Sequence, residues 1–393
     1  MTPSITQTSA PVADSHVSFY ADDLTISFNQ NPTQFTDPRT LMMKMTDHML
    51  QANWNVKTGW SAPAIIPYAP LPLDPACSVL HYGTECFEGL KAWRNKKTGK
   101  VHIFRPDLNA RRMNKSCDRI ALPSFSDEEF VKLLLKFVQI EKRFLAWEGE
   151  VEMADEDDHD FLYLRPIMIG TTPQLGVATP SDAMFLIIAS RIPAYNSKPL
   201  RLLASSPEQA VRAWPGGFGA AKVGGNYGPT MRPMSAAAKH GYDQILWLFD
   251  PERRLVTEAG AANFFVVWST PAGKTEIVTA PLSNGTILDG VTRRSVLELA
   301  RERLACESLE VIERDFGIDE VVKAHEEGRL IEAFACGTAF FVAPVAELGV
   351  DGRDIKVPLE SNGKSKSYAQ TIKKWLTEIF TGEVEHRWAA EIE

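Results

Sequence analysis

Hydrophobic side chains recur at helical spacing in one stretch near residue 130. The apolar positions are Phe130, Leu133, Leu134 and Phe137. They fall three and four residues apart, the period that brings side chains onto one face of an α-helix. Ser126 precedes them and Glu129 follows it three residues later, a spacing typical of a capping box. We therefore predict a helix that begins directly after Ser126.

Shorter apolar runs elsewhere favour strands, and two further amphipathic runs favour helices. The expected strands cover residues 161–165, 183–190, 244–249, 263–268 and 276–279, and the expected helices cover residues 291–304 and 368–380. Helices and strands occur together in both halves of the chain. This mixture predicts an α/β (α+β) class with two domains and an active-site cleft between them.

The length of 393 residues also favours two domains, because one hydrophobic core rarely serves so long a chain. We expect an N-terminal α/β domain over 1–195, a polar interdomain linker over 196–210 and a C-terminal domain over 211–393. Residues 1–40 are rich in Ser, Thr, Pro, Asn and Gln, and are expected to form a loosely ordered arm.

Composition removes several classes of function. A hydrophobic content of 44% with 23% charged residues is that of an ordinary globular protein, and a net charge of −8 disfavours nucleic acid or an anionic membrane as a partner. No apolar run approaches the ~20 residues that span a bilayer. The first twenty residues contain no Lys or Arg, so we expect neither a secretory signal nor a transit peptide, and predict a cytoplasmic location.

Metal and disulfide chemistry are not expected. The five cysteines are scattered and form no C-x-x-C pair, and the histidines show no metal-ligand spacing. The carboxylate-rich residues 148–160 have two interpretations, a cation site or a solvated surface insertion. We expect the insertion, because no glycine or regular Asp spacing organises the run.

The segment around Lys222 is the strongest local sign of chemistry. Residues 216–228 read GGFGAAKVGGNYG, so Lys222 stands among small residues where a backbone can approach a ligand closely. Desolvation there would lower the pKa of the lysine, and a neutral amine can act as nucleophile and then as general base. The segment is not a P-loop, since Ala221 precedes the lysine and Val223 follows it. A glycine-rich turn with an incidental lysine is the alternative.

Four other positions could complete a site, although each also has a purely structural interpretation. Glu258 lies between two expected strands, where a buried carboxylate needs a partner such as a protonated pyridine nitrogen. Arg105 offers a guanidinium suited to phosphate. Gly290 precedes a helix whose first N–H groups would attract an anion, and the small-residue turn at Thr338 could do the same. The alternatives are a turn glutamate, a surface salt bridge, an ordinary helix start and an ordinary tight turn.

Taken in order, these segments resemble the eukaryotic-type branched-chain aminotransferases, of the D-amino-acid-aminotransferase-like fold (fold type IV) that binds pyridoxal 5′-phosphate (PLP). The resemblance runs from about residue 20 to residue 385. The matching segments are HYG at 81–83, FEG at 87–89, FRP at 104–106, YLRP at 163–166, LGV at 175–177, residues 222–229, LWL at 246–248, Glu258 with Gly260 and Asn263, residues 288–293, and GTA at 337–339.

The resemblance implies a role for each matching position. Lys222 should form the Schiff base with PLP and move the proton, Glu258 should pair with the pyridine nitrogen, and Tyr227 should bond the ring hydroxyl. The implied cofactor-binding residues are Arg105, Lys222, Tyr227, Glu258, Leu288, Val291, Thr292 and Thr338. The implied substrate-binding residues are Tyr82, Phe87, Tyr163, Arg165, Tyr195, Ala261, Thr338, Ala339, Leu175 and Val177. Leu175 and Val177 reach a neighbouring subunit in this family, which implies a homodimer.

The function that follows is transamination of L-leucine, L-isoleucine or L-valine with 2-oxoglutarate, giving the branched 2-oxo acid and L-glutamate. Ala261 stands where animal and yeast members commonly have threonine, so the preferred substrate is open. Two alternatives remain. One is a related PLP enzyme of the same fold, such as a D-amino-acid or (R)-amine aminotransferase or an aminodeoxychorismate lyase. The other is a non-catalytic binding protein.

Overall fold

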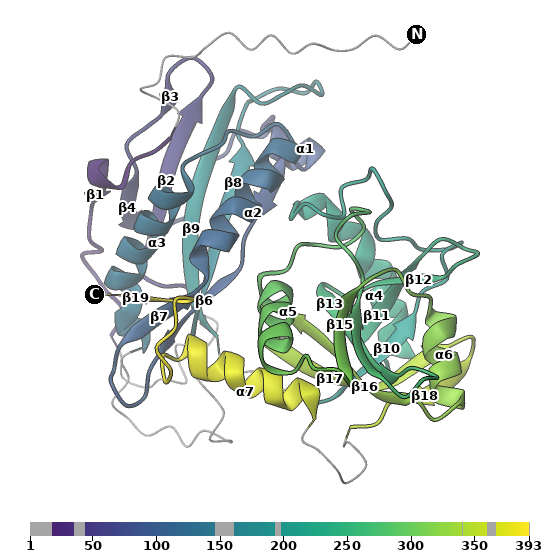
Figure 1. Cartoon of the computed structure of the whole chain (residues 1–393). Helices are drawn as coiled ribbons and strands as arrows, with labels where there is room; N and C mark the ends of the chain where they lie inside the picture. The colour runs from purple at the N-terminus through teal and green to yellow at the C-terminus, as the bar shows by residue number, and fades with distance from the viewer. Residues whose placement is uncertain are drawn as a thin grey trace, which may run out of the picture.

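The computed structural model describes residues 18–34, 44–145, 161–192, 198–339, 341–359 and 367–392. The strands form two sheets that lie side by side, each flanked by helices (Figure 1). This arrangement confirms the predicted mixture of helices and strands in both halves of the chain.

The first sheet has the strand order β1-β4-β2-β9-β8-β6-β7-β19, with β3 beside β2 and β5 beside β8. Its strands are β1 (Thr25–Ile26), β2 (His48–Asn55), β3 (Gly59–Trp60), β4 (Ala64–Pro67), β5 (Glu85–Phe87), β6 (Leu90–Arg94), β7 (Val101–Phe104), β8 (Phe161–Gly170), β9 (Asp182–Ile192) and β19 (Ala389–Ile392). The apolar sides of α2 and α3 pack on this sheet and form the first core.

The second sheet has the order β12-β11-β10-β17-β16-β13-β14-β15, with β18 beside β17. Its strands are β10 (Leu200–Ala204), β11 (Gln244–Phe249), β12 (Leu255–Ala259), β13 (Ala262–Ser269), β14 (Thr275–Thr279), β15 (Leu309–Glu313), β16 (Leu330–Gly337), β17 (Phe341–Val350) and β18 (Arg353–Lys356). Because β12 pairs with both β11 and β13, the strands from β12 through β10 and β17 to β13 close into a barrel.

Helices pack against both sheets or lie in the loops that connect their strands. They are η2 (Ala21–Asp23), α1 (Ser78–Tyr82), α2 (Pro106–Arg119), α3 (Asp127–Glu141), η4 (Lys142–Leu145), η5 (Gly224–Asn226), η6 (Gly228–Thr230), α4 (Met231–Lys239), α5 (Val291–Arg303), α6 (Ile318–Glu326) and α7 (Tyr368–Phe380). The predicted helices at α3, α5 and α7 and the predicted strands at β8, β9, β11, β13 and β14 are confirmed. β11 and α7 begin and end where their sequence patterns do.

The predicted capping box is half correct. Ser126 caps α3, since its Oγ accepts the N–H of Glu129. The Glu129 carboxylate does not return to Ser126 but accepts the N–H of Ala21 at 2.6 Å. Ala21 and Phe19 are fully buried in the first core. This part of the expected loose arm is therefore ordered, because its apolar residues cover the start of α3.

The two sheets do not divide where the sequence suggests. The expected linker contains β10, a strand of the barrel whose Leu200 and Leu202 are buried. Because polar residues precede this short apolar run, the sequence pattern did not indicate a strand there. The C-terminal strand β19 does not belong to the second sheet either, because it pairs with β7 of the first sheet.

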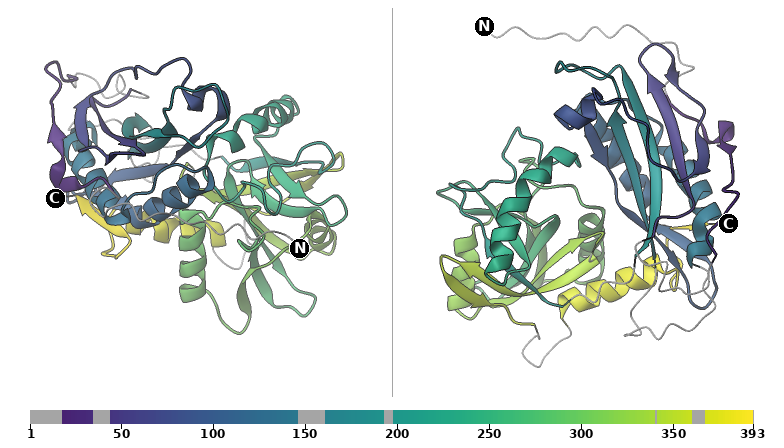
Figure 2. Two further views of the ribbon diagram at one scale, coloured as in Figure 1. Left: turned by 90° about the horizontal axis from the view of Figure 1, so that it is seen from above. Right: turned by 180° about the vertical axis from the view of Figure 1, so that it is seen from behind.

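The C-terminal segment joins the two halves. In Figure 1 α7, drawn in yellow, runs from the second sheet toward the first, and Figure 2 shows the same crossing from behind. A shared core lies along it. Trp93 and Phe104 from the first sheet pack with Phe265 and Phe334 from the second sheet and with the apolar side of α7.

Candidate active site

Lys222 lies in the loop before η5, and the first half of the chain holds its backbone. Its N–H donates to Ser116 Oγ at 2.8 Å, and its carbonyl accepts the N–H of Phe87 at 3.1 Å. The amine Nζ donates to the hydroxyl of Tyr227 at 3.1 Å and lies 4.8 Å from the centre of the Phe87 ring. The lysine is thus fixed at the junction of the two sheets.

The surroundings of Lys222 lower its pKa to about 8. Burial is the largest cause, because it disfavours the charged ammonium, and the nearby guanidinium of Arg112 adds to it. The carboxylates of Glu88 and Glu258 act in the opposite direction. A substantial fraction of the amine is therefore neutral near physiological pH, as the sequence analysis expected.

Glu258, on β12, is a buried carboxylate with fixed partners. One oxygen accepts the N–H of Leu288 at 2.8 Å, and the other pairs with Arg212 at 2.9 Å. Asn263 lies opposite Glu258 on β13. Its side-chain amide donates at 3.3 Å to the Glu258 oxygen that also accepts from Leu288. Burial raises the pKa of Glu258, while Arg212 is the main influence that lowers it.

Lys222 and Glu258 lie close enough that each charge shifts the pKa of the other group. No hydrogen bond or ion pair between them occurs in the described part of the chain. Tyr227 interacts with both groups. Its hydroxyl accepts the hydrogen bond from Lys222, and burial together with the charge of Glu258 raises the pKa of Tyr227 to about 12. Tyr227 is thus linked to Lys222 by a hydrogen bond and to Glu258 by its charge.

An aromatic wall with one cation stands next to Lys222. The Phe87 ring lies 5.1 Å from the Tyr227 ring, and the Arg165 guanidinium lies 4.6 Å from the Phe87 ring. Arg165 donates to the Tyr163 hydroxyl at 3.0 Å, and its Nε is buried without an acceptor among the described residues. Gly89 leaves room for this wall, because a Cβ there would lie 2.3 Å from the Tyr163 hydroxyl oxygen.

The start of α5 faces a small cavity. Val291 and Thr292 form its first turn, and no side chain caps the preceding Gly290. Together with Thr338 they line a cavity of about 20 Å³. Free N–H groups of a first helical turn are suited to an anion. The backbone groups of Leu288 are engaged elsewhere. Its N–H donates to Glu258, and its carbonyl accepts from Asn263 at 2.9 Å.

Arg105 precedes α2, and its guanidinium lies against α5. It donates to Ser295 Oγ and to Glu298 Oε1, both at 3.0 Å, and its Cζ lies 4.3 Å from the centre of the Trp388 ring. The side chain thus reaches the first two turns of the helix that begins at Val291.

Ala261 and Ala339 lie at a second part of the site. With Tyr227 and Arg212 they line a cavity of about 170 Å³ beside the Glu258 strand. The structure therefore brings the expected substrate turn and the expected cofactor residues to one region. Tyr195 lies outside the described residues.

The remaining predicted residues, Tyr82, Leu175 and Val177, lie on the surface. The hydroxyl of Tyr82, at the end of α1, donates to the carbonyl of Leu175. Leu175 is 71% exposed and Val177 is 84% exposed, and neither lines the two cavities described above. Such exposure of apolar side chains is typical of residues that meet a partner.

Several residues of the site escaped the sequence analysis. Arg112 donates through two nitrogens to Glu88, each at 2.7 Å, and a third donates to the Asp289 carbonyl at 3.1 Å. This pair is almost completely buried and ties α2 to the loop before α5. Glu88 belongs to the FEG segment at 87–89 that was recognised. The spacing in the sequence does not connect Arg112 with the carboxylate of Glu88, or Arg212 with the carboxylate of Glu258.

Lys91 is a second buried lysine near the site. Its Nζ donates to the Ala339 carbonyl at 3.0 Å and lies 3.8 Å from the centre of the Phe161 ring. Burial lowers its pKa to about 7. A lowered pKa therefore does not distinguish Lys222 from Lys91. The hydrogen bond to Tyr227 and the electrostatic effect of Glu258 distinguish Lys222.

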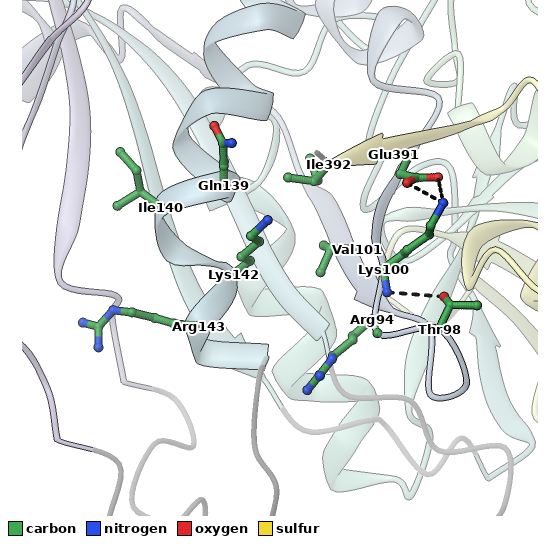
Figure 3. Close-up of a pocket in the computed structure, with 11 residues that line it drawn as sticks. Arg94, Thr98, Lys100, Val101, Gln139, Ile140, Lys142, Arg143, Glu391 and Ile392 are labelled. Atoms are coloured by element: carbon green, nitrogen blue, oxygen red, sulfur yellow. Dashed lines mark hydrogen bonds and ion pairs between the residues drawn. The ribbon is translucent and has the colours of Figure 1, made fainter.

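A second large cavity of the described chain lies away from these residues. This cavity, of about 640 Å³, lies between the end of α3, β7 and β19, and its lining residues, drawn in Figure 3, include none of the predicted site residues. Its Lys100 is already paired with Glu391 at 2.8 Å. The described ranges contain no cluster of three His, Cys, Asp or Glu placed to hold a metal, and all five cysteines are unbridged. Within the same ranges no helix has the length and apolar character needed to cross a membrane.

Comparison with known proteins identifies the family. Residues 85–348 match the model of the amino-transferase class IV family. The chain is 43% identical over 379 residues to the mitochondrial branched-chain-amino-acid aminotransferase of Saccharomyces cerevisiae, covering 95% of this chain and 93% of that protein. It is 45% identical over 345 residues to the cytosolic branched-chain-amino-acid aminotransferase of the same yeast, covering 87% and 88%.

A solved structure agrees with this assignment. The branched-chain amino acid aminotransferase from T.th., in complex with N-(5′-phosphopyridoxyl)-L-glutamate, superimposes with a TM-score of 0.64 at 25% identity, over 87% of this chain and 98% of that one. The predicted fold type is therefore confirmed. By sequence and by fold, the chain belongs to the class IV aminotransferase family, among its branched-chain-amino-acid aminotransferases.

Proposed function

We propose that this protein transfers the amino group of L-leucine, L-isoleucine or L-valine to 2-oxoglutarate, with PLP bound between Lys222 and Glu258. The observation that carries the proposal is an amine of lowered pKa, Lys222, that lies close enough to the buried carboxylate of Glu258 for each charge to shift the pKa of the other group. Near-full-length similarity to branched-chain-amino-acid aminotransferases supports the substrate class. Structures of the T.th. relative with phosphopyridoxyl-glutamate and with pyridoxamine 5′-phosphate support the cofactor.

The residues present fit PLP at each of its polar positions. Lys222 offers an amine, and Tyr227 offers a hydroxyl beside it. Glu258 offers a buried carboxylate, and an unpaired charge at such a buried position would be unfavourable. The uncapped start of α5 and Thr338 offer donors for a phosphate. Bound there, PLP would supply an electrophilic carbon for the amine and a ring that takes up the electron pair of the substrate α-carbon.

Lys222 is the proposed catalytic base. The amine is partly neutral at neutral pH because burial lowers its pKa to about 8, so it can accept the α-proton and later return it. The hydroxyl of Tyr227, 3.1 Å away, orients the amine. The tie of Lys222 to Ser116 and Phe87 keeps the base in place.

Glu258 keeps a ring nitrogen protonated by remaining ionised. Burial works against this state, since it raises the pKa of the carboxyl, and Arg212 opposes burial with a direct ion pair. The N–H of Leu288 adds a hydrogen bond that also favours the carboxylate. A carboxylate so held is a preorganised partner for a positive charge.

The substrate pocket must accept an aliphatic side chain and, in the second half-reaction, the distal carboxylate of glutamate. The Phe87 and Tyr163 rings provide apolar surface, and Arg165 provides a buried N–H that lacks an acceptor among the described residues. A single pocket with an apolar wall and one unsatisfied cation suits both. Tyr82, Ala261 and Ala339 complete this pocket in the proposal.

We also propose a homodimer, in which Leu175 and Val177 contact the neighbouring subunit. Their exposure leaves apolar surface that water does not favour. The cellular compartment stays a prediction: the sequence favours the cytoplasm, while the two yeast relatives are one mitochondrial and one cytosolic protein.

The test is a donor–acceptor panel with the purified full-length chain and PLP. L-leucine with 2-oxoglutarate should give L-glutamate, and D-alanine should give no appreciable turnover. Lys222→Ala should lower the rate by at least about a thousandfold. Turnover of D-alanine but not L-leucine would move the protein to another activity of this fold. The same panel on Ala261→Thr measures the substrate preference, which one hydroxyl can shift by roughly 1–3 kcal/mol.

A further inference from the structure

Arg105 has a backbone conformation that needs support from outside its own segment. Its φ of 45° and ψ of 50° place it in the left-handed region, which an L-residue other than glycine enters only when its surroundings hold it there. The support comes from the C-terminal segment, because the N–H of Arg105 donates to the Trp388 carbonyl at 2.7 Å. Trp388 lies between α7 and β19, at the far end of the chain.

The side chain of Arg105 is held by the same residue. The Trp388 ring covers one face of the guanidinium, with 4.3 Å between Cζ and the ring centre. Ser295 and Glu298 of α5 accept hydrogen bonds from its two terminal nitrogens. The guanidinium is thus fixed between the end of the chain and the helix whose first turn faces the phosphate cavity.

Trp388 is itself firmly placed. It is 6% exposed, and its ring packs edge-on against Phe104 at 5.9 Å between ring centres. After it, β19 pairs with β7 from Ala389↔Phe104 to Ile392↔Val101. Figure 3 shows the ion pair of Glu391 with Lys100 that adds to this pairing. The C-terminal strand therefore acts as a fixed support.

We infer that Trp388 is a positioning residue that orients Arg105 toward the cofactor phosphate, so the end of the chain determines how tightly a phosphorylated ligand binds. The inference rests on the proposed function, in which Arg105 binds that phosphate. An arginine without the stacked ring would keep its charge but lose the fixed orientation that two-pronged phosphate binding requires. Trp388 touches neither the substrate nor the reacting atoms in this account.

The test compares two ligands on the full-length chain freed of cofactor: PLP, and pyridoxal, which lacks the phosphate. Trp388→Leu should weaken PLP binding about tenfold, the scale of a lost desolvated cation–π contact. Pyridoxal binding should change by less than about twofold, since only the phosphate contact depends on Arg105. In an Arg105→Leu background, Trp388→Leu should add nothing to the loss of PLP affinity.

A matched control is Trp375→Leu. Trp375 on α7 also stacks on an arginine of α5, with 5.1 Å between the Arg303 Cζ and the ring centre, but it does not contact Arg105. This variant should leave the PLP-to-pyridoxal ratio unchanged. Trp388→Phe, which keeps a ring, should retain most of the PLP affinity.

The inference is overturned if Trp388→Leu weakens PLP and pyridoxal equally or leaves both unchanged, or if its effect persists in the Arg105→Leu background. Should Trp388→Leu fail to fold, Trp388→Met is interpreted in the same way. A wild-type chain with no preference for PLP over pyridoxal would overturn the proposed phosphate site as well. A wild-type preference that Trp388→Leu does not reduce overturns this inference alone.

Discussion

Burial favours the neutral form of both Lys222 and Glu258, since desolvation is the largest influence on the pKa of each group. The charged neighbours determine how large the pKa shift of each group is. Glu88 and Glu258 keep the pKa of Lys222 at about 8, and Arg212 opposes the protonation of Glu258. These neighbours come from the end of β5, from β12 and from the loop before Lys222, so the titration of each group is a property of the assembled fold.

The pH dependence of cofactor attachment tests the lowered pKa of Lys222. Only the neutral amine attacks a carbonyl, so the rate at which the cofactor-free chain captures PLP should rise with pH, reach half of its maximum near pH 8 and level off above it. Stopped-flow absorbance measures this rate, with Lys222→Ala as the control that should capture none. A rate that continues to rise toward pH 10.5, the ordinary lysine value, would contradict the assignment.

Removing Arg212 should destabilise the protein, and more so at high pH. In Arg212→Met the buried Glu258 loses its ion-pair partner, which costs about 3 kcal/mol in the free energy of unfolding near pH 8. The pKa of Glu258 is already raised in the folded chain, so the folded state holds a proton that the unfolded state has released above about 4.5. Stability from this group is therefore full below 4.5 and falls as pH rises through the folded pKa.

Urea unfolding of wild type and Arg212→Met at pH 5 and pH 8 measures this effect. The difference between the two proteins should be larger at pH 8, because a higher pH favours the charged carboxylate that Arg212 no longer stabilises. Adding Glu258→Gln to Arg212→Met should remove most of the pH dependence. A deficit of equal size at both pH values would show that the ion pair is not its cause.

At the scale of elements, the start of α5 connects the small cavity lined by Val291, Thr292 and Thr338 with Glu258. Gly290 precedes the helix, and a Cβ there would lie 2.1 Å from Asn263 Oδ1. Asn263 in turn donates to Glu258 and to the Leu288 carbonyl. The helix, the turn before it and the β12–β13 hairpin therefore form one unit.

Gly290→Ala tests this unit. The φ of −68° suits alanine, so the disturbance comes from the contact with Asn263 and, to a lesser degree, from Arg293 Cβ at 3.3 Å. We expect a loss of about 1–3 kcal/mol in the free energy of unfolding and weaker PLP binding. Gly225→Ala is the control, because a Cβ there meets nothing within 4 Å, and it should change stability by less than about 0.5 kcal/mol. Unchanged stability and PLP affinity in Gly290→Ala would count against the coupling.

The elements themselves were largely predictable from local patterns. The 3.6-residue period marks α3 and α7, and the apolar run 244–249 marks β11. What local patterns miss is decided by contacts across the chain. Glu129 turns to Ala21 rather than to its own helix start, and β10 is a strand because β11 and β17 lie on either side of it.

The candidate site divides in the same way. The small residues around Lys222 and the position of Glu258 between two expected strands made both residues recognisable in the sequence, and in the structure each charge shifts the pKa of the other group. Arg212, Arg112 and Trp388 carry no such mark, because a buried partner is chosen by three-dimensional distance and not by spacing in the sequence. The exposed Leu175 and Val177 were found only through the resemblance to a family.

At the scale of the whole molecule, two sheets from different parts of the chain supply opposite sides of the site, and the C-terminal strand returns to the first sheet. Exposed apolar residues at the 175–177 loop leave one more surface to cover. A second copy of the chain would cover it in the proposed homodimer.

Sedimentation tests the proposed dimer. The wild-type chain should sediment at about twice the 43.7 kDa of one subunit, and Val177→Glu should shift the equilibrium toward the monomer. Val384→Glu is the control, since Val384 is also exposed but lies on the C-terminal segment after α7. A monomeric wild type, or equal effects of both substitutions, would contradict this interface.

The most direct test of the site is to reduce the PLP-loaded protein with borohydride and locate the added phosphopyridoxyl mass by peptide mass spectrometry. Borohydride fixes the cofactor on the lysine to which it is joined. We expect the mass on Lys222 and its loss in Lys222→Ala. The mass on Lys91, the other buried lysine of low pKa, or on no lysine at all, would contradict it.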